Sequence, residues 1–98
     1  MKIDISGLSR LFENRIRLGI MSILLVNDSY DFNSLKAALG VTDGNLASHL
    51  KALEENGLVR SEKKFIARKP NTSYSATEKG EKIFRTHLKA LETIIRNK

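Results

Sequence analysis

Cysteine is absent from this 98-residue sequence, and so are long apolar runs. Without cysteine the chain has no disulfide and no thiolate metal ligand, which suits a reducing cytoplasm. The longest apolar stretch, residues 20–26, is interrupted by Ser22 and is far shorter than the roughly 20 residues that span a membrane. The first residues, MKIDISG, lack the apolar run and cleavage site of a signal peptide. We therefore expect a cytoplasmic protein that is not bound to a membrane.

Side chains arranged for catalysis are also lacking. His49 and His87 lie far apart in the sequence, on mainly helical faces with apolar neighbours. This is typical of half-buried packing residues rather than of metal ligands or catalytic bases. The sequence contains no phosphate-binding loop of the type GxxxxGKS or GxxxxGKT, no serine with a paired base and no zinc-ligand spacing. We expect no enzymatic activity, no cofactor and no metal site.

Basic residues, in contrast, are in excess. Seventeen lysine and arginine residues stand against eleven acidic ones, so the net charge is +6 and the isoelectric point is about 9.8. Hydrophobic residues make up 41% and charged residues 29%, a composition typical of one folded domain, here residues 1–98. Such a charge favours an anionic partner, and nucleic acid is the obvious one for a small domain. The alternative is that the protein is simply basic, as many small proteins are.

The spacing of apolar residues predicts helices in the first half of the chain. Apolar residues recur every three or four positions over residues 5–26, and Gly7 and Asn14 are points where this helix could split. After a polar break, Asn33 is expected to cap a short helix that Gly40 ends in a left-handed conformation.

A further helix follows after only two residues. Thr42 is expected to cap this helix, and Gly57 is expected to end it after Asn56. Two helices joined by so short a turn cross at a steep angle. We therefore predict a helix-turn-helix at about residues 33–56.

Strand-forming residues are concentrated after this helix. Residues 58–76 predict a β-hairpin, and its loop at residues 67–71 contains the only proline. Thr77 is then expected to cap a last helix over residues 78–96. The predicted fold class is mainly α-helical with a small β-hairpin.

The segment GNLASHLKALEENGLV, residues 44–59, has two different faces. In helical projection its leucines, at positions 46, 50 and 53, lie within about 60° of one another and form a core stripe. Glycine in the first turn costs a helix roughly 1 kcal/mol relative to alanine, but it permits close approach to another surface. The opposite face is composed mostly of small or hydrogen-bonding residues, namely Gly44, Ser48, Lys51 and Glu55, with Asn45 and Ala52 on a flank.

A helix face of this kind fits the major groove of DNA. Asn45 can pair with adenine, and Lys51 can pair with guanine or a phosphate, while Gly44 lets the helix start approach a phosphate. Asp43 is an awkward neighbour for a phosphate, so it either caps the helix or rejects some base sequences. The alternative is an ordinary surface helix with a tolerated glycine. The residues of this helix that we expect to contact DNA are Thr42, Asp43, Gly44, Asn45, Ser48 and Lys51.

The predicted hairpin is strongly basic. Between residues 60 and 72 it has five lysines and arginines and a single acidic residue, Glu62. Each phosphate that such a segment neutralises releases counterions, and Arg68 and Lys69 at the tip can reach a narrow minor groove. Solvated loop charge is the alternative. The residues of the hairpin that we expect to contact DNA are Lys64, Arg68, Lys69 and Thr72.

The last helix has an apolar seam suited to pairing with another helix. Phe84, Leu88, Leu91 and Ile95 are spaced by 4, 3 and 4 residues, as in a coiled coil. We expect the first and last helices, about residues 5–26 and 78–96, to form a dimerisation region, and packing within one chain is the alternative. A two-fold dimer places its reading helices roughly 34 Å apart on a pseudo-palindromic site. The first helix is expected to contribute Leu8, Leu11 and Phe12.

Four stretches of the chain together resemble a known family. They are RLGIMSILL (17–25), DFNSLKAALGVTDGNLASHLKALEENGLV (31–59), ARKPNTSYSATEKG (67–80) and the basic helix that follows. The order of elements and these stretches are similar to the winged helix-turn-helix of prokaryotic transcription regulators, in particular to short one-domain members allied to the MarR and ArsR groups. The resemblance implies that the helix from Asp43 enters the major groove, that the hairpin is the wing, and that the protein is a dimer.

The chain departs from these relatives in one respect. ArsR relatives often sense metals through cysteine pairs, which this chain lacks, so thiolate metal sensing is excluded. MarR relatives often bind small aromatic effectors, and no residue of this chain demands such a ligand. The predicted function is sequence-specific binding of double-stranded DNA as a homodimeric transcriptional regulator, with repression as the expected outcome. A winged-helix module that binds another protein, or an architectural DNA binder without base readout, is the alternative.

Overall fold

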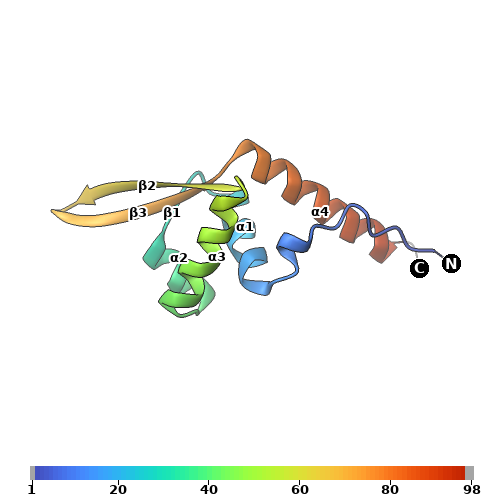
Figure 1. Ribbon diagram of the computed structural model, residues 1–98, viewed down its shortest axis with the longest axis horizontal. Coiled ribbons are helices and arrows are strands. Elements are labelled where there is room, and N and C mark those ends of the chain that lie inside the picture. Colours follow the sequence, from blue (N-terminus) through green and yellow to red (C-terminus); the bar gives the residue numbers. More distant parts are fainter. Residues whose placement is uncertain (1, 97–98) are drawn as a thin grey trace.

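The computed structural model describes residues 2–96 and combines helices with one long hairpin (Figure 1). A 3-10 turn, η1 (Arg10–Phe12), precedes α1 (Arg15–Leu25), β1 (Tyr30–Asp31), α2 (Phe32–Leu39) and α3 (Asp43–Glu55). The hairpin strands β2 (Val59–Ile66) and β3 (Lys69–Ala76) lead into α4 (Glu78–Arg96). This confirms the predicted class, mainly helical with a small sheet. We call the hairpin, residues 59–76, the wing.

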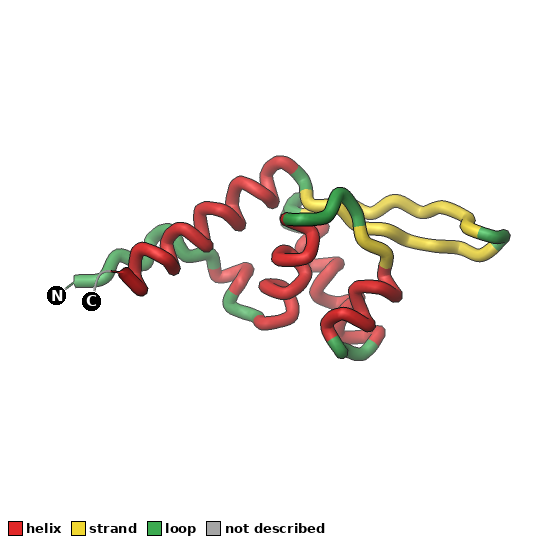
Figure 2. Tube along the Cα trace, turned by 180° about the vertical axis from the view of Figure 1, so that it is seen from behind, coloured by secondary structure: helices red, strands yellow, loops and turns green. Residues whose placement is uncertain are grey.

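The first predicted helix is shorter than the apolar spacing suggested. Residues 2–9 are not helical but run beside the far end of α4, and α1 begins only at Arg15 (Figure 2). The break comes at Asn14, whose Oδ1 accepts hydrogen bonds from the backbone N–H groups of Ile16 and Arg17 at 2.8 and 3.2 Å. The break at Asn14 is one of the two split points named from the sequence, whereas the prediction of helix over residues 5–9 was wrong, because those residues are not helical.

The helix-turn-helix follows the predicted turn chemistry closely. Gly40 ends α2 with a φ of 64°, and Thr42 Oγ1 caps α3 by accepting from the N–H of Asn45 at 3.2 Å. Gly57 follows α3 with a φ of 73°. The cap of α2 was wrongly placed at Asn33, since Asp31 Oδ1 accepts from the Ser34 N–H at 2.7 Å.

The second strand of the wing is longer, and the loop between the two strands is shorter, than predicted. Strands β2 and β3 pair from Val59↔Ala76 to Ile66↔Lys69, and only Ala67 and Arg68 form the turn. Their φ values of 52° and 66° match the two-residue turns that suit the twist of a hairpin. The predicted loop at residues 67–71 was therefore too long, because its last three residues belong to β3.

Proline is tolerated within β3 because of its position in the sheet. The sheet has the order β1-β3-β2, and β1 ends where Asp31 pairs with Ser73. Pro70 pairs with Phe65 of β2 on one side. On the other side of β3, β1 pairs only with Tyr74 and Ser73, so within the described chain no strand lies beside Pro70 there. The missing N–H of a proline at such an edge costs no ladder hydrogen bond. The short strand β1 was not predicted, because its two residues lie in a polar segment.

The core joins the helix-turn-helix to the wing and to α4. A Cβ at Gly80 would overlap the backbone carbonyl of Leu58, so glycine is what allows α4 to approach the start of the wing. Phe12 and Phe84 meet edge to face, with ring centroids 5.1 Å apart. The buried apolar residues are Phe12, Ile20, Met21, Leu24, Leu35, Leu46, Leu50, Leu53, Leu58, Val59 and Phe84.

Two residues expected at a subunit interface thus belong to the core of one chain. Phe12 and Phe84 are only 3% and 1% exposed, so their side chains are not accessible to a second subunit. His87 packs against both rings, and its Nδ1 accepts a hydrogen bond from the Ser9 backbone N–H at 2.9 Å. The prediction for these two phenylalanines is corrected accordingly, because the segment before α1 folds back onto α4 and covers them.

Candidate nucleic-acid interface

The two faces of α3 are separated as the helical projection predicted. Leu46, Leu50 and Leu53 are no more than 1% exposed, and they pack into the core with α1 and the wing. On the other side of the helix, the small and polar residues are all exposed to solvent, namely Gly44, Asn45, Ser48, Lys51 and Glu55. The core thus anchors α3 by one stripe and leaves its polar face accessible along the whole helix.

Gly44 is not required by the fold of the chain. No atom within residues 2–96, apart from its immediate neighbours and the helix backbone, lies within 4 Å of a Cβ added at Gly44. The residue is part of α3 and has no left-handed conformation to explain it. Neither backbone strain nor internal packing among the described residues therefore accounts for a glycine at this position.

The start of α3 has its charges and hydrogen bonds arranged in a defined way. Thr42 is the cap, and Asp43 instead forms an ion pair with Lys36 of α2, with Nζ and Oδ1 2.8 Å apart. The pair is exposed and contributes little to stability, but it offsets the acidic charge beside the helix N-terminus. Sequence analysis missed Lys36, although its position in the preceding helix, seven residues before Asp43, brings the two side chains together across the turn.

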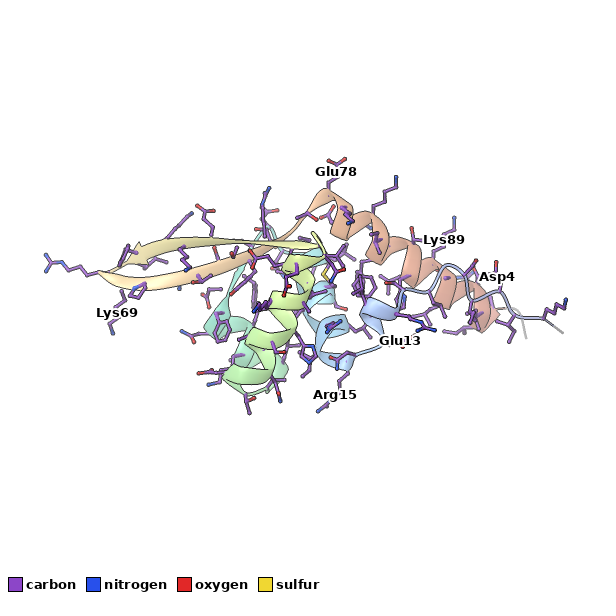
Figure 3. All side chains as sticks on the ribbon, in the orientation of Figure 1. Asp4, Glu13, Arg15, Lys69, Glu78 and Lys89 are labelled. Carbon is purple, nitrogen blue, oxygen red and sulfur yellow. The ribbon has the colours of Figure 1, made fainter. Side chains whose placement is uncertain are left out.

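The basic residues of the wing are largely solvated. Arg68 at the turn and Lys69 next to it are exposed, and Figure 3 shows Lys69 at the outer end of the wing. Lys64 lies 3.4 Å from Glu62, an exposed pair that weakens its charge only slightly. Thr72 is partly buried and lines a shallow hollow of about 320 Å³ together with Phe32 and Asn33 at the start of α2.

The wing and α3 are linked by side-chain hydrogen bonds. Ser61 Oγ of β2 donates to Glu54 Oε2 of α3 at 2.8 Å. Thr77 Oγ1, beyond the other end of the wing, donates to the Gly57 carbonyl at 2.6 Å. These bonds hold the wing on the flank of α3 that carries Glu54, beside the polar face and not over it.

A second contact reaches α3 from α1. Arg17 Nε donates to His49 Nδ1 at 3.0 Å, and burial together with the charge of Arg17 lowers the pKa of His49. The neutral imidazole is thus the form that accepts this bond. Arg17 was not singled out from the sequence, because only the packing of α1 against α3 places it there.

The region expected to mediate dimerisation has its own accessible apolar surface. Leu88 and Ile95 on α4 are 37% and 65% exposed, while Leu91 is partly buried. Leu8 and Leu11 on the N-terminal side are also partly buried. These five side chains are at least partly accessible to a second subunit, whereas Phe12 and Phe84 are buried.

Among residues 2–96 there is neither a cluster suited to a metal ion nor a helix able to cross a membrane. Within residues 2–96, no group of three or more histidine, aspartate or glutamate side chains is arranged to hold a metal ion. In the same part of the chain, every helix is too short or too polar to cross a membrane.

Comparison with known proteins places this arrangement in a family. The winged helix DNA-binding domain family matches residues 16–95. The uncharacterized protein MJ0432 of Methanocaldococcus jannaschii is 34% identical over 88 residues, which cover 90% of this chain and 96% of that protein.

Solved structures support the same assignment. The transcriptional regulator homologue from Pyrococcus horikoshii is 38% identical, with a TM-score of 0.83, and the match covers 89% of this chain and 86% of that one. A MarR-family transcriptional regulator from Rhodococcus shares the fold at 16% identity, with a TM-score of 0.73, covering 91% of this chain and 62% of its own. The chain belongs to the winged helix DNA-binding domain family, a family of DNA-binding proteins and not of enzymes.

Proposed function

We propose that the protein is a homodimeric transcriptional regulator that binds a specific double-stranded DNA site and represses transcription from it. Membership of the winged helix DNA-binding domain family supports DNA binding, and likeness to the Pyrococcus horikoshii regulator homologue supports a regulatory role. The observation that carries the proposal is the exposed polar face of α3, with a glycine that nothing inside the chain requires.

In this proposal α3 reads base edges in the major groove. Asn45 pairs with adenine, Lys51 with guanine or a phosphate, and Ser48 with any of several bases. Gly44 and Thr42 seat the helix start near a phosphate, which the N-terminal amides attract. The ion pair of Asp43 with Lys36 supports this placement, because it reduces repulsion between the carboxylate and the phosphate.

The wing holds the DNA backbone beside the reading helix. Lys64, Arg68 and Lys69 supply positive charge, and Thr72 supplies a hydroxyl at the edge of the hollow next to α2. Since counterions are released when phosphates are neutralised, this part of the interface makes binding fall with salt for every DNA sequence. The bond between Ser61 and Glu54 supports a fixed placement of the wing relative to α3.

A second copy of the chain completes the regulator. The proposed interface uses the accessible apolar residues of the N-terminal segment and α4, which are Leu8, Leu11, Leu88, Leu91 and Ile95. Two-fold symmetry then presents two reading helices to half-sites about one helical turn, roughly 34 Å, apart. Repression follows from occupancy, because a dimer on its operator excludes other proteins from the same DNA.

Selection of bound duplexes from a random pool tests the proposal. A two-fold symmetric motif, combined with a dimeric mass in solution, is the expected result. Salt-dependent binding without any enriched motif would instead indicate an architectural DNA binder. Affinity no better than about 10⁻⁴ to 10⁻⁶ M for every duplex, the range of non-specific binding, would favour a module that binds another protein.

Repression itself needs a separate measurement. Transcription in vitro from a promoter that contains the selected motif should fall as the protein is added. The variant Lys51→Ala, which retains the wing, is the matched control and should repress less. An increase in transcript would contradict the repressor assignment while leaving DNA binding intact.

A further inference from the structure

The outer end of the wing carries two exposed apolar side chains. Phe65 is 79% exposed and Ile66 is 58% exposed. Of the other large apolar residues exposed within the described chain, Val26 stands alone at the end of α1, and Ile3 and Ile5 alternate in the N-terminal segment. Leu88 and Ile95 belong to the proposed dimer surface. The pair on the wing is the only such pair of adjacent residues outside that surface among residues 2–96, and the proposed function does not use it.

The fold of one chain leaves this pair uncovered. Figures 1 and 2 show the wing projecting beyond the helical part of the molecule, with its turn at the far end. An exposed apolar hairpin end invites association with other strands, which natural proteins usually avoid by placing charges there. Charges are present here as well, since Lys64, Arg68 and Lys69 lie within three residues of the pair. An apolar pair beside several cations fits a partner whose surface carries negative charge and whose interior is apolar.

The strand register determines where each side chain faces. Alternate residues of β2 share a face, so Phe65 lies on the same face of the wing as Lys63 and Ser61. Ser61 is the residue that bonds to Glu54 of α3. Phe65 therefore lies on the side of the wing that is joined to the reading helix, and Ile66 lies on the opposite side.

The reach of the wing matches the geometry of DNA. Phe65 lies four residues beyond Ser61, or about 14 Å along a strand that rises about 3.4 Å per residue. Half a turn of B-DNA, the distance from a major groove to the next minor groove, is about 17 Å. With α3 in the major groove, a wing that starts on the flank of α3 and extends this far is long enough to approach the flanking minor groove.

We propose that Phe65 acts as an apolar wedge that inserts from the wing tip into the minor groove of DNA, partly unstacks a base step and bends the duplex. Inserted apolar side chains are a general way in which proteins kink DNA from the minor groove. Arg68 and the lysines neutralise the flanking phosphates, and Ile66 contacts the sugars on the other side of the tip. The wedge rests on the proposed function, since it requires that the wing lies on DNA.

A DNA-bending measurement tests the wedge directly. A duplex bearing the selected motif, with a fluorophore at each end and 2-aminopurine in the flanking minor-groove steps, reports bending and unstacking in one titration. The unmodified protein should raise both the energy transfer and the 2-aminopurine emission. Phe65→Ser should abolish both signals and weaken binding by about tenfold, as for the loss of one stacked base. Phe65→Leu should retain part of both signals.

The salt dependence and a matched control distinguish an apolar contact from a charged one. Phe65→Ser should leave the slope of log K against log salt unchanged, because no phosphate contact is removed. Val26→Ser is the control, since Val26 is 78% exposed but lies outside the wing, and this variant should bend DNA normally. Circular dichroism of each variant confirms that the fold is retained.

The outcomes separate this proposal from the one on which it rests. DNA binding with no rise in either signal, or unchanged signals in Phe65→Ser, overturns the wedge and leaves the DNA-binding function standing. Absence of binding to any duplex overturns both. The variant can also be tested for sedimentation with vesicles of phosphatidylserine and phosphatidylcholine. If Phe65→Ser reduces the amount of protein that sediments with the vesicles but leaves DNA bending unchanged, the tip binds a membrane surface and the wedge is overturned.

Discussion

Gly44→Ala should stabilise the fold and weaken DNA binding at the same time. Alanine has room, because no atom of the described residues, its chain neighbours and helix backbone aside, lies within 4 Å of the added Cβ. Replacing a helical glycine by alanine without strain contributes about 0.4–1 kcal/mol. For a domain of this size that corresponds to a rise in Tm of about 2–8 °C.

The same methyl group should interfere with the complex. It projects from the face of α3 that we place in the major groove, where an extra methyl in a close contact costs about 1–3 kcal/mol. This corresponds to roughly 5- to 150-fold in Kd. Thermal denaturation measures the first effect, and titration of the selected duplex, followed by fluorescence anisotropy, measures the second.

Two further variants make the comparison specific. Ser22→Ala removes an exposed hydroxyl of α1 that donates to the Leu18 carbonyl. It places an alanine on a helix surface away from the proposed interface, so Kd for DNA should not change. Gly80→Ala should lower Tm, because its Cβ would overlap the Leu58 carbonyl. A higher Tm with an unchanged Kd in Gly44→Ala would refute the argument that this glycine lies against DNA.

Four other predictions concern bases, charge, subunits and pH. Asn45→Ala should relax preference at a single base pair of the selected motif, by about 1–3 kcal/mol, when the random-pool selection is repeated with the variant. Arg68→Ala should weaken binding to all duplexes alike and reduce the magnitude of the salt slope by about 1, and an unchanged slope would mean that the wing tip does not touch phosphate. Leu88→Glu should shift the protein from dimer to monomer in analytical ultracentrifugation while the fold is retained, because the side chain is already accessible in one chain. His87 has a lowered pKa because it is buried, so its contribution to stability is present above about pH 6.5 and is lost as the pH falls through its folded pKa. Tm measured from pH 7.5 to 5 should therefore fall less in His87→Asn, which retains an acceptor for the Ser9 N–H but does not titrate, and equal falls would contradict this role of His87.

The local features of the sequence predicted local structure well. The leucine stripe of α3, the cap at Thr42 and the turns at Gly40 and Gly57 all involve residues within about four positions of one another. Helical periodicity, capping and left-handed glycines depend on such short-range geometry, so they can be inferred without knowledge of the rest of the chain. The polar face of α3 was identified on the same basis.

Contacts between distant segments decided what the periodicity left open. Phe12 and Phe84 belong to stripes that could face another subunit or the same chain, and only the packing of the N-terminal segment against α4 buries them. The pairing of β1 with β3 and the contact of Arg17 with His49 also join residues more than thirty positions apart. The sequence by itself determined which faces of each helix are apolar and where each helix ends. Tertiary structure decided which of those faces the chain covers, because burial depends on which distant segments meet.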